Sequence, residues 1–588
     1  MSLVLFFMPP TLPTTHDLDE KMLKLLREKK TARQHQERRH EDWNSNYELY
    51  RNKVKTNRLT QRQAVNIPLM KETVKTALSK IDDAPTTKWQ ERSGDEIKEI
   101  IFQQMWDEKF RHKKFEWLDV LDKKNVLLYG LSTKKLNPMD QGVDVDVLDP
   151  YDVVYDPMMS SMDTETARFI IHQNIFRSLR DVLADERYTE DGRNKLKIWS
   201  MSQEGIVQSK VNKEEWEKKL ERIRSMGVES SEFPFFAAGD VIVNLCEHYT
   251  NFWNTKTKEF DKHVVVYADD WAELMDEKLE DLTGITEYPF VMWAEDPETN
   301  DIYPDGIADL VRTPNKIVNV WFSQMVENRT LQNFQMHWYD ATKQGYTPQT
   351  YEPGAGKMLP APGNPRETIF PVEINGLDES LVAIDFLTKV VERGSGAVAI
   401  DKGVNETGKQ TLGEVEILVG KAMERSVAMQ KFYRASWEEL ARKWEKMTQA
   451  NPPKRISLYK TGPSGKLYEK VVYPSDWKSK AGYEPTVSST SEQEANDIKT
   501  IQKFQFVMQQ FPNNPALRKI AQKRELELLD FSADELKQIQ DAEDQMNEMA
   551  SQQTVQPTQQ APASQPSPQM QPQQGEIADL LAELQSVS

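Results

Sequence analysis

The most constraining feature of the sequence is an uninterrupted helical pattern that runs from Thr411 to Met447. Apolar residues recur along it every three or four positions, as they do on one face of an amphipathic helix. Thr411 and Glu414 also have the spacing of a capping box. At about 1.5 Å per residue, this helix would be about 55 Å long. A single small domain does not need such a helix, so we expect it to link domains or to cross an assembly.

Length, charge and cysteine content limit the class of protein. The chain has 588 residues, which is enough for about four domains. Its 93 acidic residues outnumber its 75 basic residues, giving a formal net charge of -18. A general cationic nucleic-acid binder is not expected, because such proteins hold phosphates with Lys and Arg. The single cysteine, Cys246, excludes an intrachain disulfide framework and a cysteine-rich metal site. No apolar run approaches the roughly 20 residues that span a bilayer, so we expect a soluble protein with no membrane partner.

The two ends of the chain differ in composition from the rest. Residues 1–59 contain the basic helical stretch KMLKLLREKKTARQHQERRH, which we interpret as a basic N-terminal arm. The arm is either a solvated helix or flexible segment, or a contact for nucleic acid or an acidic partner. Residues 551–575 are rich in Gln and Pro and are predicted to be a disordered linker. In residues 576–588, EIADLLAELQ predicts a short amphipathic helix that either frays or docks in a partner's groove.

The chain as a whole is predicted to be α+β and mainly helical, and residues 60–303 are predicted to form an α+β region. Three apolar stripes with helical spacing come first, and Gly130 stands where the third helix, Lys113 to Tyr129, should end. Alternation of valine with aspartate over Val143 to Val147 then predicts a half-buried strand. A charged helix from Asn212 to Met226 and strands near VIVNLCEHYT and HVVVYADDW complete the region.

Two further helices enclose a small insert. The pattern after Pro304 predicts one helix that is kinked at Pro314, and the pattern from Asp378 to Arg393 predicts a second. The segment between them is rich in Gly and Pro and favours short strands and turns. A flexible glycine-containing segment, GSGAVAIDKGVNETGKQ, connects the second helix to the long helix. A single copy would leave such a pair of helices poorly buried, so side-by-side packing of several copies is expected.

Motifs for enzyme chemistry are weak, and we expect no catalytic residue, metal or cofactor. Residues 394–399 match G-x-G-x-x-A but follow a helix, whereas a dinucleotide site needs a strand, a turn and a helix. Cys246 and His248 would point to the same side of a strand, yet two ligands do not make a zinc site. A packed cysteine beside a hydrogen-bonded histidine is the better interpretation.

The order of these parts resembles the portal proteins, or head-to-tail connectors, of tailed double-stranded DNA bacteriophages. Four segments carry the resemblance, and it covers about Thr60 to Lys446. They are Asn66 to Pro85 (NIPLMKETVKTALSKIDDAP), Asn125 to Gly130 (NVLLYG) with VDVLDPYDVVYDP, Asp305 to Asn315 (DGIADLVRTPN) and Gly408 to Arg425 (GKQTLGEVEILVGKAMER). Each motif alone is weak, but their order and spacing together are fairly specific.

The resemblance implies a portal-type architecture that assembles into a ring, typically a dodecamer, with a central channel. The implied parts are a wing (60–303), a stem helix (304–338), a clip (339–375), a second stem helix (376–393), a tunnel loop (394–410), a long wing helix (411–449) and a crown-like helical region (450–550). The basic N-terminal arm and the Gln-rich tail lie outside the resemblance.

The implied function is a channel at one capsid vertex of the virion, assembled in the host cytoplasm, through which viral DNA is packaged and ejected. The implied partners are further copies of the chain, the terminase large subunit, major capsid and scaffolding proteins, head-tail adaptors and double-stranded DNA. Two alternatives remain at this point. One is a non-viral helical scaffold or adaptor, and the other is a DNA-processing enzyme.

Two groups of residues are candidate contacts on this interpretation. In the tunnel loop, Lys402, Asn405 and Lys409 would face DNA, although ordinary loop lysines are an equal alternative. The clip offers apolar and aromatic side chains that could dock terminase or an adaptor, or form subunit-subunit core. These clip residues are Tyr346, Tyr351, Met358 and Phe370.

Overall fold

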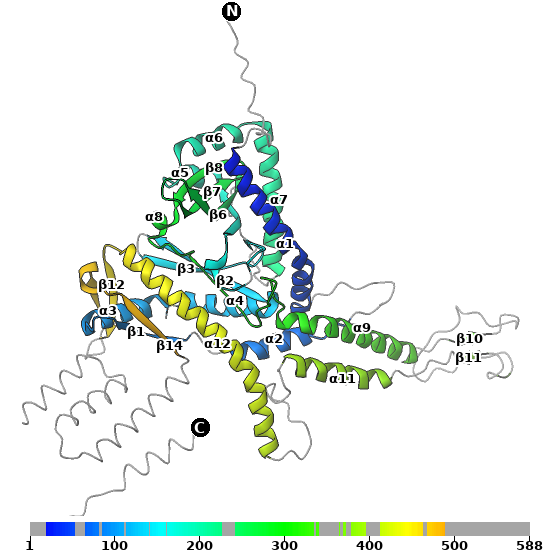
Figure 1. The fold of residues 1–588 in the computed structure, drawn as a ribbon. Coiled ribbons are helices and arrows are strands. Elements are labelled where there is room, and N and C mark those ends of the chain that lie inside the picture. Colours follow the sequence, from blue (N-terminus) through cyan, green and yellow to red (C-terminus); the bar gives the residue numbers. More distant parts are fainter. Residues whose placement is uncertain are drawn as a thin grey trace, which may run out of the picture. The chain divides into compact units, whose positions relative to one another are not determined.

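The computed structural model describes one α+β unit (Figure 1). Contacts divide the chain into two units, Met1–Gly462 with Lys466–Asn496, and Pro463–Gly465 with Asp497–Ser588. All described residues belong to the first unit. They are residues 19–52, 65–81, 85–110, 113–139, 142–159, 161–225, 241–333, 337–339, 364, 369–371, 378–395, 412–461 and 467–488. Most of the predicted crown-like helices, the Gln/Pro-rich linker and the terminal helix lie outside them.

A five-stranded antiparallel sheet has apolar side chains buried on both faces. Its order is β4-β5-β6-β7-β8. The strands are β4 (Val153–Tyr155), β5 (Phe169–Ser178), β6 (Ile242–Asn254), β7 (Glu259–Ala268) and β8 (Ala272–Lys278). Val264 and Val266 lie in the main core, whereas the alternate residues Val265 and Tyr267 lie in a second cluster, as the two-residue period of a strand requires. Two predicted strands, those of β6 and β7, are confirmed.

Helix α1 (Glu20–Tyr50) covers the second face of this sheet (Figure 1). Met22, Leu25 and Ala32 lie in the cluster that contains Val265 and Tyr267. The basic side chains on the same helix form ion pairs with the sheet, for example Lys21 with Glu273 at 2.8 Å and Lys29 with Asp270 at 2.5 Å. The prediction of a separate basic arm is therefore wrong for this helix. Apolar residues at helical spacing among the lysines bind it to the body.

The interpretation of Cys246 and His248 is confirmed. Both side chains are buried in β6. The Cys246 thiol donates a hydrogen bond to the Tyr267 hydroxyl, and His248 Nε2 lies 2.9 Å from a Glu28 carboxylate oxygen of α1. Burial raises the pKa of Cys246 to about 11. The thiol is therefore an unreactive core group.

Short helices flank the five-stranded sheet. The predicted charged helix at 212–226 begins earlier than expected, because α7 spans Gln203–Ser225. Asn212 of α7 donates a hydrogen bond to the Ile242 carbonyl at 3.1 Å and so fixes the helix to the start of β6. The other elements here are η1 (Thr164–Thr166, a 3-10 helix), α5 (Leu179–Ala184), α6 (Glu190–Ser200) and α8 (Leu279–Thr283).

The β7–β8 turn holds a buried carboxylate whose replacement should stabilise the protein. Asp269 has a positive φ of 50°. Its Oδ1 accepts hydrogen bonds from Asn212 and from the Asn244 backbone amide. Its buried Oδ2 has no partner among the described residues. Burial raises the pKa of Asp269 to about 6. The folded state therefore retains a proton that the unfolded state has lost, and stability falls as pH rises from about 4 to 6.

Asp269→Asn should therefore raise the free energy of unfolding by about 1–2 kcal/mol at pH 7, with the gain vanishing near pH 4. Asparagine also tolerates a positive φ better than most residues. Denaturant unfolding at several pH values measures the gain. Asp270→Asn is the comparison, because Asp270 also has a positive φ but is exposed and pairs with Lys29, so its replacement should bring no gain at pH 7. A gain of equal size at pH 4 and pH 7 would contradict the assignment to burial.

A three-stranded antiparallel sheet, ordered β3-β2-β9, forms the centre of the unit. It comprises β2 (Leu131–Met139), β3 (Gly142–Leu148) and β9 (Phe290–Ala294), and α4 (Lys113–Tyr129) leads directly into β2. The predicted end of α4 at Gly130 and the strand over Val143 to Val147 are confirmed. The central strand β2 escaped prediction, because its Lys134 and Lys135 are polar residues that are nevertheless buried.

Another group of elements contains a cluster of aromatic side chains. Strand β1 pairs with β14 across a long sequence separation, and Phe102 stacks on Tyr483 with ring centroids 4.0 Å apart. Strands β12 and β13 form a hairpin at the start of the segment interpreted as the crown-like helical region (450–550). The elements of this group are α2 (Leu69–Lys80), β1 (Thr86–Glu91), α3 (Glu96–Phe110), β12 (Ile456–Thr461), β13 (Leu467–Val472), α13 (Pro474–Trp477) and β14 (Tyr483–Ser488).

Candidate assembly site: a helix pair and its attachment

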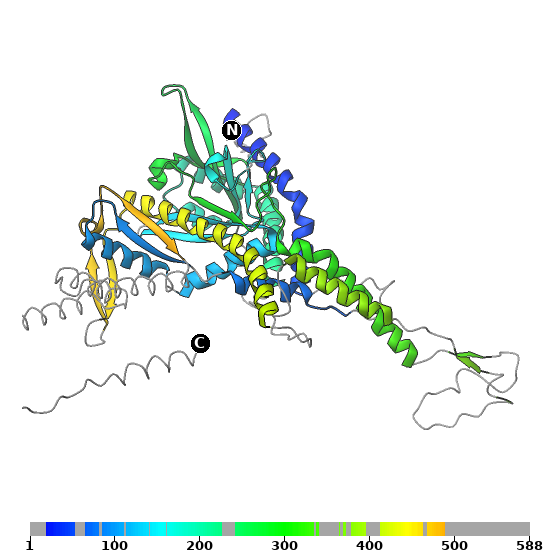
Figure 2. The ribbon, with the colours of Figure 1, turned by 60° about the horizontal axis from the view of Figure 1, so that its bottom comes forward.

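Two helices that are far apart in the sequence lie side by side (Figures 1 and 2). They are α9 (Ile307–Asn333) and α11 (Asp378–Ser395), here called the helix pair. Both were predicted, and α9 continues through Pro314. At the ends of the pair, β10 (His337–Tyr339) and β11 (Ile369–Pro371) form an antiparallel ladder. The ladder holds together the two ends of the segment predicted as the clip.

One face of α11 is apolar and uncovered within the described residues. Val382 is 73% exposed, Phe386 62% and Val390 40%. These residues are four apart, so they form one stripe along the helix. In contrast, Val391 is buried in the main core. A large exposed apolar surface on a folded chain is typical of an interaction site.

The root of the helix pair is a close contact between two backbones. Gly130 follows α4 with a φ of +89°, and a Cβ atom built on it would lie 2.0 Å from the Pro304 carbonyl oxygen. A Cβ atom on Gly306 would lie 2.8 Å from the Val126 carbonyl oxygen. Only glycine at both positions allows the end of α4 to touch the start of α9.

A buried carboxylate, Asp309, connects α1 to this root. Its side chain is 4% exposed. Asp309 pairs with Arg39 of α1 at 3.0 Å and with Arg312 at 2.6 Å. It also accepts hydrogen bonds from Asn46 of α1 and from the Gly306 amide, each at 3.0 Å. Four donors thus satisfy the charge and hold α9 against α1.

A row of polar side chains attaches the segment before α2 to α9. Asn315, Asn319 and Ser323 are four residues apart and are all buried. Asn315 Oδ1 accepts the Met70 amide hydrogen at 2.9 Å, Asn319 Oδ1 accepts that of Ile67 at 2.8 Å, and Ser323 Oγ accepts that of Val65 at 3.0 Å. These bonds satisfy backbone amides that would otherwise be buried without partners.

The long predicted helix is α12 (Leu412–Ala450), a 39-residue helix. It packs on the three-stranded sheet (Figure 1), and Lys134 of β2 is buried in contact with it. Lys134 Nζ lies 2.7 Å from Asp122 Oδ2 of α4 and 3.2 Å from Ser436 Oγ of α12. The ring centroids of Trp293, Tyr433 and Trp437 lie 5.8 to 5.9 Å from the same nitrogen. An aromatic cage with one carboxylate thus holds the ammonium.

Further buried charges surround this cage. Asp119 pairs with Lys123 at 2.5 Å and accepts a hydrogen bond from the Tyr433 hydroxyl of α12. Burial raises the pKa of Asp119 above its usual value, although both partners oppose the rise. Lys443 of α12 donates to the Phe290 carbonyl at 2.7 Å. The position of α12 therefore depends on specific polar contacts as well as on apolar packing.

Most residues predicted from the resemblance to contact DNA or partners lie outside the described residues. These are Lys402, Asn405 and Lys409 of the loop and Tyr346, Tyr351 and Met358 of the insert. Phe370 lies in β11, directly opposite Trp338. Poor burial of the helix pair in a single copy was expected, but the residues of the exposed stripe of α11 were not predicted. Its signal was present, because DESLVAIDFLTKVV is apolar on more than one helix face and so predicts burial on more than one side.

The described residues contain no group of three or more His, Cys, Asp or Glu side chains placed to hold a metal ion. Within the same ranges, no helix combines the length and the apolar character that crossing a membrane requires.

Comparison with known families identifies the class of protein as a phage portal protein. The family model described as phage SU10 portal protein matches residues 17–583, which is nearly the whole chain. The chain therefore belongs to the phage SU10 portal protein family. No curated protein matches it. The match includes α1 and the C-terminal region, so it extends past Thr60 and Lys446, the limits of the sequence resemblance. The family is structural rather than enzymatic, and its members are oligomeric components of the capsid.

Proposed function

We propose that copies of this chain form a ring, of about twelve subunits, at one capsid vertex, and that double-stranded DNA is packaged and ejected through its channel. The single observation that carries this proposal, beyond the family, is the uncovered apolar stripe of α11. One side of α11 packs on α9 and the other side presents Val382, Phe386 and Val390. A second copy that places its own helix pair on this stripe makes a head-to-tail interface, which closes into a ring when the rotation fits.

The charges of the helix pair suit a channel that DNA slides through. Helix α9 contains two acidic and three basic residues, and α11 contains four acidic and two basic residues. Some of these charges are already paired, such as Asp385 with Lys389 at 3.0 Å. A wall with little net positive charge releases few counterions from DNA and so binds it weakly. Weak binding is what a conduit for a moving duplex needs.

Phe386→Asp should abolish ring assembly while leaving the fold of each chain intact. The substitution places a charge in the centre of every proposed interface, where burial of an unpaired carboxylate is strongly unfavourable. Light scattering and negative-stain electron microscopy would show the ring fraction falling at least about tenfold, since a cost of about 1.4 kcal/mol per interface already suffices. Thermal unfolding should be nearly unchanged, because Phe386 is exposed.

The matched control is Val207→Asp on α7. Val207 is also an exposed apolar residue, at 60%, but it is not on the helix pair. Rings that persist with Phe386→Asp, or rings that Val207→Asp disrupts equally, would contradict the role given to α11.

The segment between α11 and α12 is proposed as the DNA-facing loop, with Lys402, Asn405 and Lys409 as its contacts. The proposal rests on the family and on the place of the segment between a helix of the pair and the long helix. Lys402→Ala with Lys409→Ala should reduce DNA retention in assembled particles severalfold without preventing ring formation. Unchanged packaging and retention would reject this role for the loop.

The β10–β11 ladder and the insert that it closes, including Tyr346, Tyr351, Met358 and Phe370, are proposed as the docking site for the terminase large subunit and later for head-tail adaptors. Contacts with major capsid and scaffolding proteins are proposed for the outer parts of the ring. A terminase-binding assay on a chain that lacks residues 345–365 tests the first assignment, and undiminished binding would reject it.

A further inference from the structure

The β6–β7 hairpin extends beyond both of its neighbours in the five-stranded sheet. On one side, β5 pairs with β6 only as far as Thr250, opposite Phe169. On the other side, β8 pairs with β7 only as far as His263, opposite Lys278. Residues Asn251–Asn254 and Glu259–Lys262 therefore pair only with each other among the described strands. We call these eight residues the overhang. Neither outer edge has a strand partner among the described residues, and the Asn251 carbonyl accepts a hydrogen bond from Lys24 at 3.0 Å, so most of both edges is open to a further strand.

Aromatic rings lie on both faces of the overhang. Trp253 and Phe260 face each other across the strands, with ring centroids 5.0 Å apart, and are 54% and 67% exposed. Phe252 lies on the opposite face, where Lys24 of α1 stands 4.6 Å above its ring. Large exposed aromatic side chains on an unpaired strand edge are unusual in a finished protein. A strand added here would find apolar contacts on both of its faces.

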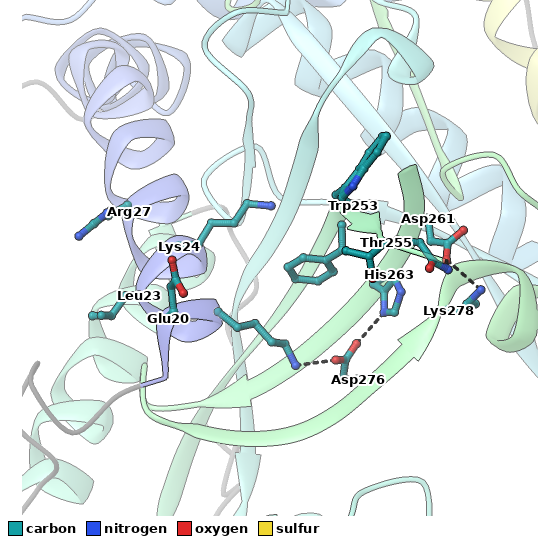
Figure 3. Close-up of a pocket in the computed structure, with 13 residues that line it drawn as sticks. Glu20, Leu23, Lys24, Arg27, Trp253, Thr255, Asp261, His263, Asp276 and Lys278 are labelled. Atoms are coloured by element: carbon teal, nitrogen blue, oxygen red, sulfur yellow. Dashed lines mark hydrogen bonds and ion pairs between the residues drawn. The ribbon is translucent and has the colours of Figure 1, made fainter. Parts of the chain in front are cut away.

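A groove of about 890 Å³ lies on the Phe252 face, between α1 and the hairpin (Figure 3). Its charged side chains largely neutralise one another. Lys21 and His263 both bind Asp276, at 2.5 and 2.8 Å, and Lys278 binds Asp261 at 2.9 Å (Figure 3). A groove with few unpaired charges favours an uncharged occupant over an acidic or basic partner.

We propose that residues Leu3–Met8 of the same chain add to the overhang as a further strand. This segment, LVLFFM, is apolar at every position, which is the pattern of a strand that is buried on both faces. Backbone hydrogen bonds at the free edge would supply affinity, and alternate side chains would contact Phe252 on one face and Trp253 with Phe260 on the other.

The connection between the segment Leu3–Met8 and the start of α1 is short. The described chain begins at Asp19, and the first turns of α1, with Glu20, Lys21 and Lys24, line the groove. Eleven residues from Met8 to Asp19 can span at most about 36–40 Å. Pro9, Pro10 and Pro13 favour an extended connection. So short a connection keeps the effective concentration of the segment at the groove high, and this favours the same chain over another copy.

Thiol labelling of the full chain tests the proposal. Because Cys246 is buried and its pKa is raised to about 11, it should not react with a thiol reagent. Labelling therefore reports only on the engineered cysteine. Phe7→Cys should react with a thiol reagent at least about tenfold more slowly than Thr14→Cys in the connection. Adding Trp253→Ala with Phe260→Ala should remove this protection, since the added strand would lose its aromatic contacts on that face. Lys256→Ala at the hairpin turn is the matched control and should preserve it.

Two further measurements test the proposal without the double alanine variant. A synthetic peptide with the sequence of residues 2–9 should compete for the overhang and increase labelling of Phe7→Cys, even if the double alanine variant fails to fold. Oxidation of Phe7→Cys with Thr255→Cys should give a crosslink within one chain on non-reducing electrophoresis. Equal labelling of Phe7→Cys and Thr14→Cys, absence of competition even by millimolar peptide, or crosslinks only between chains would overturn the proposal. None of these readouts depends on ring formation.

Discussion

Gly130→Ala is expected to lower the free energy of unfolding by at least about 3 kcal/mol. Two costs add at this position. Alanine disfavours the left-handed backbone with φ of +89°, which contributes about 1–2 kcal/mol. The new Cβ atom would also lie 2.0 Å from the Pro304 carbonyl oxygen, so the end of α4 and the start of α9 must move apart. That movement would disturb the neighbouring bonds of Asp309 with Gly306 and with Asn46.

Gly94→Ala separates the two costs, because Gly94 has a similar φ of +82° but nothing lies within 4 Å of its added Cβ atom. Its loss should be limited to about 1–2 kcal/mol. Denaturant unfolding of both variants gives the difference, which measures the close contact at the root of the helix pair. Equal losses would show that backbone conformation alone requires glycine at position 130.

Local sequence patterns predicted the helices and strands of this fold better than they predicted the contacts between them. The end of α4 at Gly130 followed from a glycine placed just after a helical stripe, and the structure confirms it. The close approach of the Pro304 carbonyl to that glycine could not be predicted, because no local pattern relates residues so far apart. The long helix was also predicted from a local pattern, because its apolar stripe is continuous from Thr411 to Met447.

Buried charge explains most of what sequence reasoning missed. Strand β2 contains Lys134 and Lys135, which normally lie on the surface and are buried here because Asp122 and Glu247 bind them. Likewise, the basic residues of α1 suggested a solvated arm, although Lys21, Lys29 and Arg39 all have carboxylate partners on the body. The carboxylate partners of these basic residues come from distant segments of the sequence. The charge of a residue alone therefore did not predict whether its side chain is exposed. The uncovered stripe of α11 is different, because a helix with apolar residues on more than one face already indicates a second partner.

Lys134→Met should destabilise the protein by about 3–5 kcal/mol, although methionine nearly preserves the volume and apolar stem of lysine. The reason is the carboxylate left behind. Asp122 is fully buried, and without Lys134 its remaining hydrogen bond is the one from Trp293 Nε1 at 2.9 Å. An uncompensated charge in such a place costs more than the original pair contributed. Strand β2 and α4, which carry this pair, should lose amide-exchange protection together with α12, whose Ser436 and aromatic side chains contact Lys134.

Two controls distinguish this explanation from a general sensitivity of α12. Combining Lys134→Met with Asp122→Asn removes the stranded charge and should recover at least half of the loss. Lys446→Ala breaks an exposed ion pair of the same helix with Glu287 and should cost less than about 1 kcal/mol. If the double variant were as unstable as Lys134→Met alone, the cage would act through shape rather than charge. If charge dominates, the Lys134 ammonium, which Asp122 neutralises, keeps the long helix in one position on the sheet through Ser436 and the aromatic cage, while the segment before that helix is proposed to contact moving DNA.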